Sequence, residues 1–441
     1  MPLKLSIIQP SRYRSKSDLT PHKVDKRSVV GLTLPYLAAL TPPGWDVTLV
    51  DEETVDIDFA APVDLVAITT RTINCLRAYE VADRFRKQGT PVIMGGPHTY
   101  FHADEAAEHC DAVGIGEGER IWPSMLDDFV NGRMVTFYRG PASRGLEKLP
   151  LPRWDLLDFS RYSFVKTFSV EASRGCPNAC EFCSERFYLG RQYRFRPVED
   201  VVADVRGTGS RYILFTDSNF GGRPSHTREL MEALVPLKVH WSALWPADLC
   251  LDGGFMDLAK RSGLLHVNVG MESIDEETLR GLGKKGNKVD RYGEALGNLR
   301  KRGVSYSLNF IFGWDSEKDD VFSSTLAFLE KEKVPAAYFN ILTPHKGTPF
   351  YDRMEVDGRI IDIEEIGRWP GIRCHIRPTQ QTPAELERRV AAMYRKFYTY
   401  PSMLARLPLP VTRPAIASWI INLSQRRVAR APDGVENFDE Y

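Results

Sequence analysis

Short apolar runs alternate with helical stretches along the first 140 residues of the chain. Five of these runs predict β-strands, at residues 3–10, 46–52, 64–69, 91–96 and 111–116. Helices are predicted between them, at residues 31–41, 73–88, 103–109 and 119–131. Such alternation favours a doubly wound parallel sheet, and sheets of this kind bind ligands at the carboxyl ends of their strands.

A segment broken by Gly145, Pro150 and Pro152 separates this region from a second alternation. Six further strands are predicted, at residues 167–173, 212–217, 239–245, 266–272, 305–313 and 337–343. Helices are predicted between them, at residues 197–206, 225–235, 254–262, 275–282, 290–302 and 319–332. Six strand–helix units predict a partial barrel, with its chemistry on the loops at the carboxyl ends of the strands.

We therefore predict an α/β protein made of four parts. These are a Rossmann-like domain at 1–140, a linker at 141–166, a partial (β/α)6 TIM-like barrel at 167–345 and a mostly helical extension at 346–441. Residues 379–405 predict a helix that would cap the barrel, followed by a shorter one, and its apolar face carries Leu386, Val390, Met393 and Phe397. Residues 413–430 join an apolar segment to a basic end, which is typical of packing against the protein or of peripheral contact with a membrane.

Composition and charge narrow the function. The chain has 58 Lys and Arg residues and 58 Asp and Glu residues, so its formal net charge is zero. Without a global positive field we expect a small-molecule substrate and no nucleic acid. The sequence opens without a signal-peptide pattern, and no apolar run approaches the roughly 20 residues that cross a bilayer. Seven thinly spread cysteines do not form a disulfide framework, so we expect a cytoplasmic protein with reduced thiols, at most peripheral at the inner membrane face.

Three of these cysteines, Cys176, Cys180 and Cys183, lie in the loop "SRGCPNACEFCSERF" after the first predicted barrel strand. Their spacing lets three thiolates converge on one metal centre. Closed zinc and iron–sulfur sites take four protein ligands, and the remaining cysteines are poor candidates for a fourth: Cys75, Cys110, Cys250 and Cys374. A cubane cluster with one open iron is the favoured interpretation. A zinc site completed by a histidine, or three unrelated thiols, are the alternatives.

The Cx3Cx2C spacing, with Phe182 before the last cysteine, resembles the signature of the radical S-adenosylmethionine (SAM) superfamily. The preceding "SRGCP" and the doubly wound N-terminal part resemble the branch with a cobalamin-binding domain. This resemblance implies that the cysteines hold a [4Fe–4S] cluster whose open iron is chelated by SAM. It also implies a flavodoxin- or ferredoxin-type electron donor, and hydrogen abstraction from the substrate by a 5′-deoxyadenosyl radical.

Other loops resemble the SAM-binding segments of the same superfamily. "FTDSNF" resembles a stretch that faces the methionine end of SAM, although Ser218 replaces its middle acid. "GMES" resembles a segment at the ribose and carboxylate, and "NFIFG" one beside the adenine. Together with Phe182, the implied contacts are Asp217, Asn219, Glu272, Ser273, Phe312 and Gly313.

In the N-terminal part, "TTRTIN", "GGPHTYF" and "GEGE" follow three predicted strands. Predicted cobalamin contacts in these loops are Thr70, Gly95, Gly96, Gly116 and Glu117. The string Asp-x-His-x-x-Gly of methionine synthase-like proteins is absent from residues 1–140. We therefore predict no histidine below the cobalt, whose lower face would be held by water or by a side chain such as Arg71. For His98 and His102 an ordinary loop-and-cap role is favoured over a metal pair.

The favoured function is cobalamin-dependent methylation of an unactivated carbon in a small molecule, with lipid-like and tetrapyrrole-like substrates included. Three alternatives stay open. The first is cobalamin-independent oxidation, cyclisation or rearrangement. The second is thiomethylation of RNA or protein, although the N-terminal part has only Cys75 and Cys110 where such relatives carry three further cluster cysteines. The third is a binding module for cobalamin or a cluster, without turnover.

Overall fold

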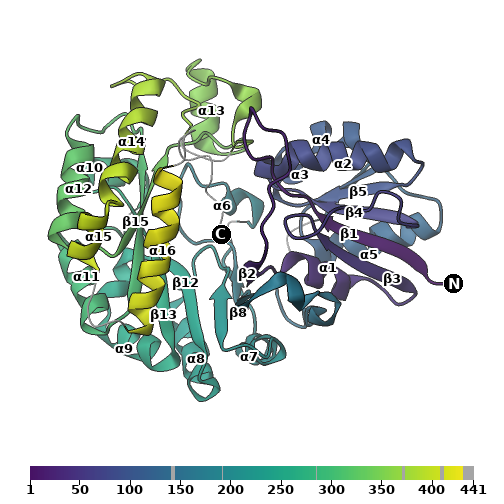
Figure 1. Ribbon diagram of the computed structural model, residues 1–441, viewed down its shortest axis with the longest axis horizontal. Coiled ribbons are helices and arrows are strands. Elements are labelled where there is room, and N and C mark those ends of the chain that lie inside the picture. Colours follow the sequence, from purple (N-terminus) through teal and green to yellow (C-terminus); the bar gives the residue numbers. More distant parts are fainter. Residues whose placement is uncertain (141–144, 191, 285, 370–372, 408–411, 431–441) are drawn as a thin grey trace. The chain divides into compact units, whose positions relative to one another are not determined.

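The computed structural model describes residues 1–140, 145–190, 192–284, 286–369, 373–407 and 412–430 (Figure 1). The chain divides into two compact units. The first comprises Met1–Val170 with Arg194–Tyr212, and the second comprises Glu171–Tyr193 with Ile213–Tyr441. The four parts predicted from the sequence, with boundaries at 140, 166 and 345, remain a prediction.

The first unit contains a six-stranded sheet in the order β3-β1-β4-β5-β6-β7. The strands are β1 (Leu3–Gln9), β3 (Trp45–Asp51), β4 (Leu65–Thr69), β5 (Val92–Gly95), β6 (Ala112–Ile115) and β7 (Phe137–Arg139). All neighbouring strands are parallel. This confirms the doubly wound parallel sheet. The strand order changes direction between β1 and β4, so the loop after β4 lies at a topological switch point.

Alternating side chains of each strand build two cores, one on each face of this sheet. Val66 and Ile68 pack with α2 (Cys75–Lys87) and α4 (Ala103–His109). Leu65 and Ala67, one residue out of phase, pack with the other two main helices, α1 (Thr33–Leu40) and α5 (Gly118–Val130). Because successive residues of a strand point to opposite faces, apolar runs of this kind form strands that are buried on both sides.

The first unit also has elements that the sequence pattern did not predict. They are β2 (Arg27–Val30), α3 (Pro97–Phe101) and β7. β2 pairs in parallel with β8 (Tyr162–Val170). Each of the three is five residues long or shorter, and segments of that length carry too little periodicity to stand out from a loop. This unit also contains β10 (Arg194–Phe195) and α7 (Val198–Gly207).

The second unit contains five barrel strands, in the order β15-β14-β13-β12-β11. The first predicted barrel strand corresponds to β8. The five strands are β11 (Tyr212–Phe215), β12 (His240–Pro246), β13 (Leu264–Glu272), β14 (Ser305–Phe312) and β15 (Ala336–Ile341). Helices connect them: α8 (Pro224–Leu234), α9 (Gly253–Ser262), α10 (Glu276–Gly281), α11 (Tyr292–Lys301) and α12 (Val321–Lys331). The pairs from β12 to β15 are parallel. The predicted partial barrel is therefore confirmed.

Four helices end the described chain: α13 (Pro349–Val356), α14 (Pro383–Phe397), α15 (Tyr400–Arg406) and α16 (Arg413–Ala429). Thr382, Thr399 and Thr412 cap the last three, each accepting a hydrogen bond from a backbone N–H in the first turn. α14 buries the four apolar residues predicted for its inner face, and α16 runs beside the barrel strands (Figure 1). No helix in the described ranges is long and apolar enough to cross a membrane.

Candidate functional site

The cysteine loop lies between β9 (Ser173–Arg174) and α6 (Glu185–Tyr188). Cys180 is buried, and Cys176 and Cys183 are partly buried. Burial raises the pKa of Cys183 to about 11, with a smaller contribution from the Cys180 thiol. Burial also raises the pKa of Cys180, and there Cys176 contributes in the same direction. The thiols are therefore close enough to interact, and a metal centre would have to displace their protons.

Asp217 lies two residues beyond β11 and holds the segment that precedes the cysteine loop. One of its carboxylate oxygens accepts a hydrogen bond from Ser173 Oγ, and the other accepts one from Ala172 N at 3.1 Å. Burial raises the pKa of Asp217 to about 7. The carboxylate thus joins the end of β11 to the residues that lead into the cysteines. The resemblance implied a contact with SAM, whereas both of these hydrogen bonds are made within the chain.

Asn219 contacts the cysteine loop directly. Its Nδ2 donates to Cys176 Sγ at 3.7 Å, and its own carbonyl oxygen accepts from Tyr193 Oη at 3.1 Å. The side-chain oxygen Oδ1 is buried and has no hydrogen-bond partner among the described residues. Buried amide oxygens are rarely left unpaired, because the loss of hydration costs free energy. This oxygen therefore suits a ligand N–H beside the cysteines.

Glu272 and Ser273 lie at the end of β13. Glu272 has φ +64°, an unusual conformation for a residue with a side chain, and its Oε1 lies 2.6 Å from Lys284 Nζ. Ser273 Oγ accepts a hydrogen bond from Asp275 N at 3.0 Å, which closes a local turn. Glu272 is thus brought near the cysteine loop, since Gly283, which precedes its partner Lys284, lies against Ala179. The hydroxyl of Ser273 accepts this hydrogen bond from Asp275, the residue that caps the start of α10.

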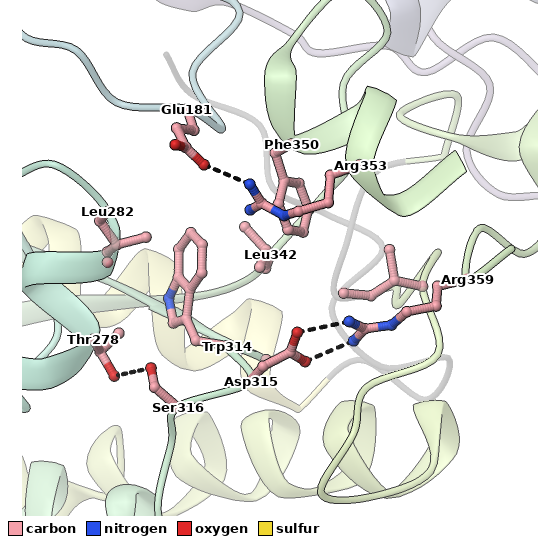
Figure 2. Close-up of a pocket in the computed structure, with 13 residues that line it drawn as sticks. Glu181, Thr278, Leu282, Trp314, Asp315, Ser316, Leu342, Phe350, Arg353 and Arg359 are labelled. Carbon is pink, nitrogen blue, oxygen red and sulfur yellow. Dashed lines mark hydrogen bonds and ion pairs between the residues drawn. The ribbon is translucent and has the colours of Figure 1, made fainter. Parts of the chain in front are cut away.

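A pocket of about 190 Å³ lies beyond the carboxyl ends of β13, β14 and β15 (Figure 2). Its apolar wall includes Leu282, Trp314, Leu342 and Phe350. Two ion pairs border it: Asp315 with Arg359, through two contacts of 2.6 Å, and Glu181 with Arg353, at 2.7 Å. The Phe182 ring meets Trp314 edge-on at 5.4 Å, so the aromatic residue of the cysteine loop reaches the wall of this pocket.

The two residues expected beside the adenine have different places. Gly313 lines the pocket. Phe312 is buried and stacks on Phe322 of α12 at 5.0 Å, so its ring belongs to the packing between sheet and helix. Sequence reasoning missed Glu317, which accepts a hydrogen bond from Gly313 N at 2.8 Å, and whose pKa burial raises to about 8. The sequence offered one signal for this contact: Glu317 comes four residues after Gly313, the glycine at the end of β14.

In the first unit, the loops after β4 and β5 contact each other. Thr70 N donates to Gly95 O at 2.8 Å. Gly96 has φ +116°, and a Cβ on it would lie 2.6 Å from Thr70 O, so only glycine permits this approach. Thr70 Oγ1 is buried without a hydrogen-bond partner among the described residues. The structure thus brings Thr70, Gly95 and Gly96 together at the switch point.

Gly116 and Glu117 follow β6, the next strand of the sheet. Gly116 approaches the backbone of Gly140. The Glu117 carboxylate receives two hydrogen bonds from Arg194, at 2.6 and 3.0 Å, and both side chains are buried. Sequence reasoning assigned Glu117 to a cofactor. The structure places its charge in an ion pair within the unit.

His98 is completely buried, in α3. Its Nε2 lies 2.8 Å from Tyr79 Oη and its Nδ1 lies 3.2 Å from Thr72 Oγ1, while His102 stacks on its ring at 4.5 Å. Ligand atoms of Cys75, His98 and Glu105 lie within 4.8 Å of one another, a spacing that a metal ion could bridge. Because both ring nitrogens already face hydroxyl groups, the geometry favours a packing role for this histidine.

Comparison with known proteins agrees with this arrangement. The model of the radical SAM superfamily matches residues 170–329, which run from the end of β8 to α12. Residues 170–329 therefore form a radical SAM domain. Bacteriochlorophyllide d C-12(1)-methyltransferase of Chlorobaculum tepidum is 28% identical over 443 residues, which cover 97% of this chain and 96% of that protein. The C-8(2)-methyltransferase of the same organism is also 28% identical and covers 87% of this chain and 88% of that protein.

Among solved structures, the radical SAM methyltransferase TsrM of Kitasatospora setae matches both units. The superposition has a TM-score of 0.66 at 17% identity and covers 98% of this chain and 90% of TsrM. TsrM was determined with cobalamin and a [4Fe–4S] cluster bound. This likeness shows the fold, a doubly wound domain combined with a radical SAM barrel.

The residues of this radical SAM domain fit the cofactors that such domains bind. The cysteine loop offers a donor set made only of sulfur, which suits iron–sulfur clusters. Oδ1 of Asn219, which has no partner in the described part of the chain, gives an acceptor beside Cys176, where a ligand amino group would be held. The apolar pocket reached by Phe182 suits an adenine ring. The sequence signal covered the cysteines and Asn219, but it did not include Trp314, Glu317 or Lys284.

Proposed function

We propose that the protein is a cobalamin-dependent radical SAM methyltransferase that acts on an unactivated carbon of a small molecule of the tetrapyrrole or lipid class. The likeness to a bacteriochlorophyllide methyltransferase over 97% of this chain carries the proposal. Balanced charge supports a small molecule over a nucleic acid, whose binding depends on phosphate contacts.

In this proposal each part of the second unit has one task. Cys176, Cys180 and Cys183 hold the cluster, and Asp217 fixes the strand end that leads into their loop. Asn219 and Glu272 orient the methionine and ribose portions of SAM. When bound, the cluster and the cofactors supply the electron, the radical and the methyl group. The protein itself supplies orientation and the exclusion of water.

The first unit would hold cobalamin at the carboxyl edge of its sheet. The Thr70 hydroxyl has no hydrogen-bond partner within the described ranges, and the Gly96 backbone approaches Thr70 closely. Both features support this assignment, because a corrin and its tail need small residues and polar groups. Gly95 and Gly116 border the same edge. A water molecule or Arg71 would face the cobalt from below, since both ring nitrogens of His98 already have partners within the chain.

The test is anaerobic reconstitution with iron, sulfide and hydroxocobalamin, followed by removal of free cofactor. We expect one [4Fe–4S] cluster and one corrin per chain, release of 5′-deoxyadenosine from SAM, and methyl transfer to bacteriochlorophyllide d or a close analogue. A cluster with SAM cleavage but no retained corrin would contradict the methyltransferase and favour cobalamin-independent radical chemistry. Tight, salt-sensitive binding of structured RNA would favour thiomethylation instead.

A flavodoxin- or ferredoxin-type protein is the proposed electron donor. We also propose peripheral contact with a membrane through α16. The outward residues Ile416, Ile420 and Leu423 are 47%, 63% and 44% exposed, whereas polar Ser418 and Asn422 face inward. Helices that lie on membranes carry such an apolar stripe beside basic residues.

The basic residues of this helix support an anionic lipid surface. Arg413, Arg427 and Arg430 are exposed beyond the two ends of the stripe, and residues 413–430 contain no Asp or Glu. We expect flotation with vesicles of 30% phosphatidylglycerol in phosphatidylcholine, and none with Ile420→Asp. Equal flotation of both proteins would contradict the contact, and a concentration-dependent dimer that Ile420→Asp abolishes would assign the stripe to a second copy.

A further inference from the structure

A buried ion pair lies against the end of β13, outside the set of residues that the sequence pointed to. Lys284 Nζ is 2.6 Å from Glu272 Oε1, and the two side chains are 12% and 9% exposed. Gly270 faces both: a Cβ on this glycine would lie 2.7 Å from Glu272 Oε1 and 3.0 Å from Lys284 Nζ. The pair is thus packed over the backbone of β13, where only glycine leaves it room.

The loop that carries Lys284 is attached to both neighbouring parts of the site. Asn287 Nδ2 donates to Gly270 O at 3.0 Å and to Met271 O at 2.8 Å, which ties the loop to β13. On its other side the loop lies against the cysteine loop, since a Cβ on Gly283 would be 3.4 Å from Ala179 O. Lys284 therefore has a fixed position between β13 and the cysteines.

Lys284 brings a positive charge to the side of the cysteine loop, because Gly283, the preceding residue, lies against Ala179. Burial alone would lower the pKa of its ammonium group, but the Glu272 carboxylate at 2.6 Å opposes this, so that the pKa is raised and the group stays charged. A fixed cation beside a cluster favours the reduced state, which carries one more negative charge.

We propose that Lys284 is a positioning residue with two effects. It holds the carboxylate of Glu272, whose backbone is left-handed, in place, and it puts a permanent positive charge beside the cluster-binding cysteines. The inference rests on the proposed function in so far as the cysteines bind a cluster. Without the ammonium group, Glu272 would be a buried anion with no partner, and it would turn away from the bound SAM. The same change would remove a fixed cation from the side of the cysteine loop.

The experiment compares reconstituted wild-type enzyme with Lys284→Met, Lys284→Arg and Glu272→Gln, and uses exposed Lys288→Met as the matched control. Iron content, the cluster midpoint potential from an EPR-monitored titration and the dissociation constant of SAM are measured for each. We expect Lys284→Met to keep its iron, to shift the midpoint to a more negative potential and to weaken SAM binding at least tenfold. Lys284→Arg should retain most of the wild-type potential, and Lys288→Met should match the wild type.

Glu272→Gln gives a second test with the opposite sign, because it removes an anion and leaves the ammonium in place. We expect a more positive midpoint together with weaker SAM binding. A Lys284→Met cluster with wild-type potential and wild-type SAM affinity would overturn the inference, and so would shifts of the same sign in Lys284→Met and Glu272→Gln. If Lys284→Met does not fold, the sign in Glu272→Gln decides. Failure of the wild-type protein to take up a cluster would overturn the proposed function itself.

Discussion

The two candidate sites of this protein are built in different ways. Around the cysteines, side chains from several strand ends lie near one loop, and Asn219 has an oxygen beside Cys176 that no described residue pairs with. At the edge of the first sheet, the contacts are mostly between backbone groups, as between Thr70 and Gly96. The difference follows from the ligands: a cluster needs sulfur at fixed spacing, whereas a large corrin is held by shape and backbone polarity. The first kind of site leaves a sequence signature and the second hardly does.

The largest effect is expected at the cysteine loop. Alanine at Cys176, Cys180 or Cys183 should abolish 5′-deoxyadenosine formation, because a cluster with two protein ligands would not be retained. Cys374→Ala is the matched control, since Cys374 is buried and its pKa is likewise raised to about 11 by burial. It should keep its activity and its iron. Wild-type turnover by Cys180→Ala would mean that the loop holds no cluster.

The ion pair between Glu117 and Arg194 tests whether the first unit uses Glu117 for stability or for a ligand. Arg194→Met leaves a buried carboxylate without its partner, which costs about 3–5 kcal/mol of unfolding free energy. Arg153→Met, which removes the exposed partner of Asp155, should cost less than about 1 kcal/mol. Urea unfolding measures both. Unchanged stability of Arg194→Met together with loss of corrin would return Glu117 to the cofactor site.

The sequence predicted long, regular elements well and short ones poorly. All five strands that apolar runs predicted in the first sheet are present in the structure, with ends within a few residues of the prediction. The same is true of every predicted barrel helix. β2, α3 and β7 were missed because they are too short to show a period. Tertiary contacts account for the other omissions: Glu317 and Lys284 acquire their roles only when loops distant from the cysteines fold against a strand end. No local pattern marks Glu117 as the partner of Arg194, 77 residues later.

Glu317 predicts a pH dependence in the second unit. Burial raises the pKa of Glu317 from 4.5 to about 8, so the folded state binds a proton that the unfolded state has already lost. The stability contribution of this group is therefore complete below about pH 4.5 and is lost as the pH rises toward 8. The loss should reach about 3 kcal/mol between pH 5 and pH 8.

Glu317→Gln should therefore lose about 3 kcal/mol less stability than the wild type between pH 5 and pH 8, as measured by urea unfolding at each pH. Asp217, whose pKa burial raises to about 7, contributes equally to both proteins. Asp315→Asn serves as a contrast, because the Arg359 guanidinium lowers the pKa of that carboxyl. The contribution of Asp315 is present at neutral pH and is lost only in acid, so its variant should keep the wild-type slope. The same pH dependence of stability in the wild type and in Glu317→Gln would contradict the assignment.

The smallest effect is expected at Thr70. A variant there tests whether a side chain contributes to a site that is otherwise built from backbone groups. Thr70→Val keeps the shape of the side chain and removes a buried hydroxyl that has no partner among the described residues. Stability should stay constant or rise, because no hydrogen bond within the chain is lost. Corrin retention should weaken by about 1 kcal/mol, or roughly fivefold, if the hydroxyl meets cobalamin.

Thr99→Val is the matched control, since the Thr99 hydroxyl donates to Gly96 O at 3.0 Å and to Gly114 O at 3.1 Å. That variant should lose stability with little specific effect on the corrin. Equilibrium dialysis with hydroxocobalamin and urea unfolding measure the two quantities. A Thr70→Val protein that loses stability as Thr99→Val does, and retains cobalamin as the wild type does, would make Thr70 part of the packing and leave the corrin to the backbone of the loops alone.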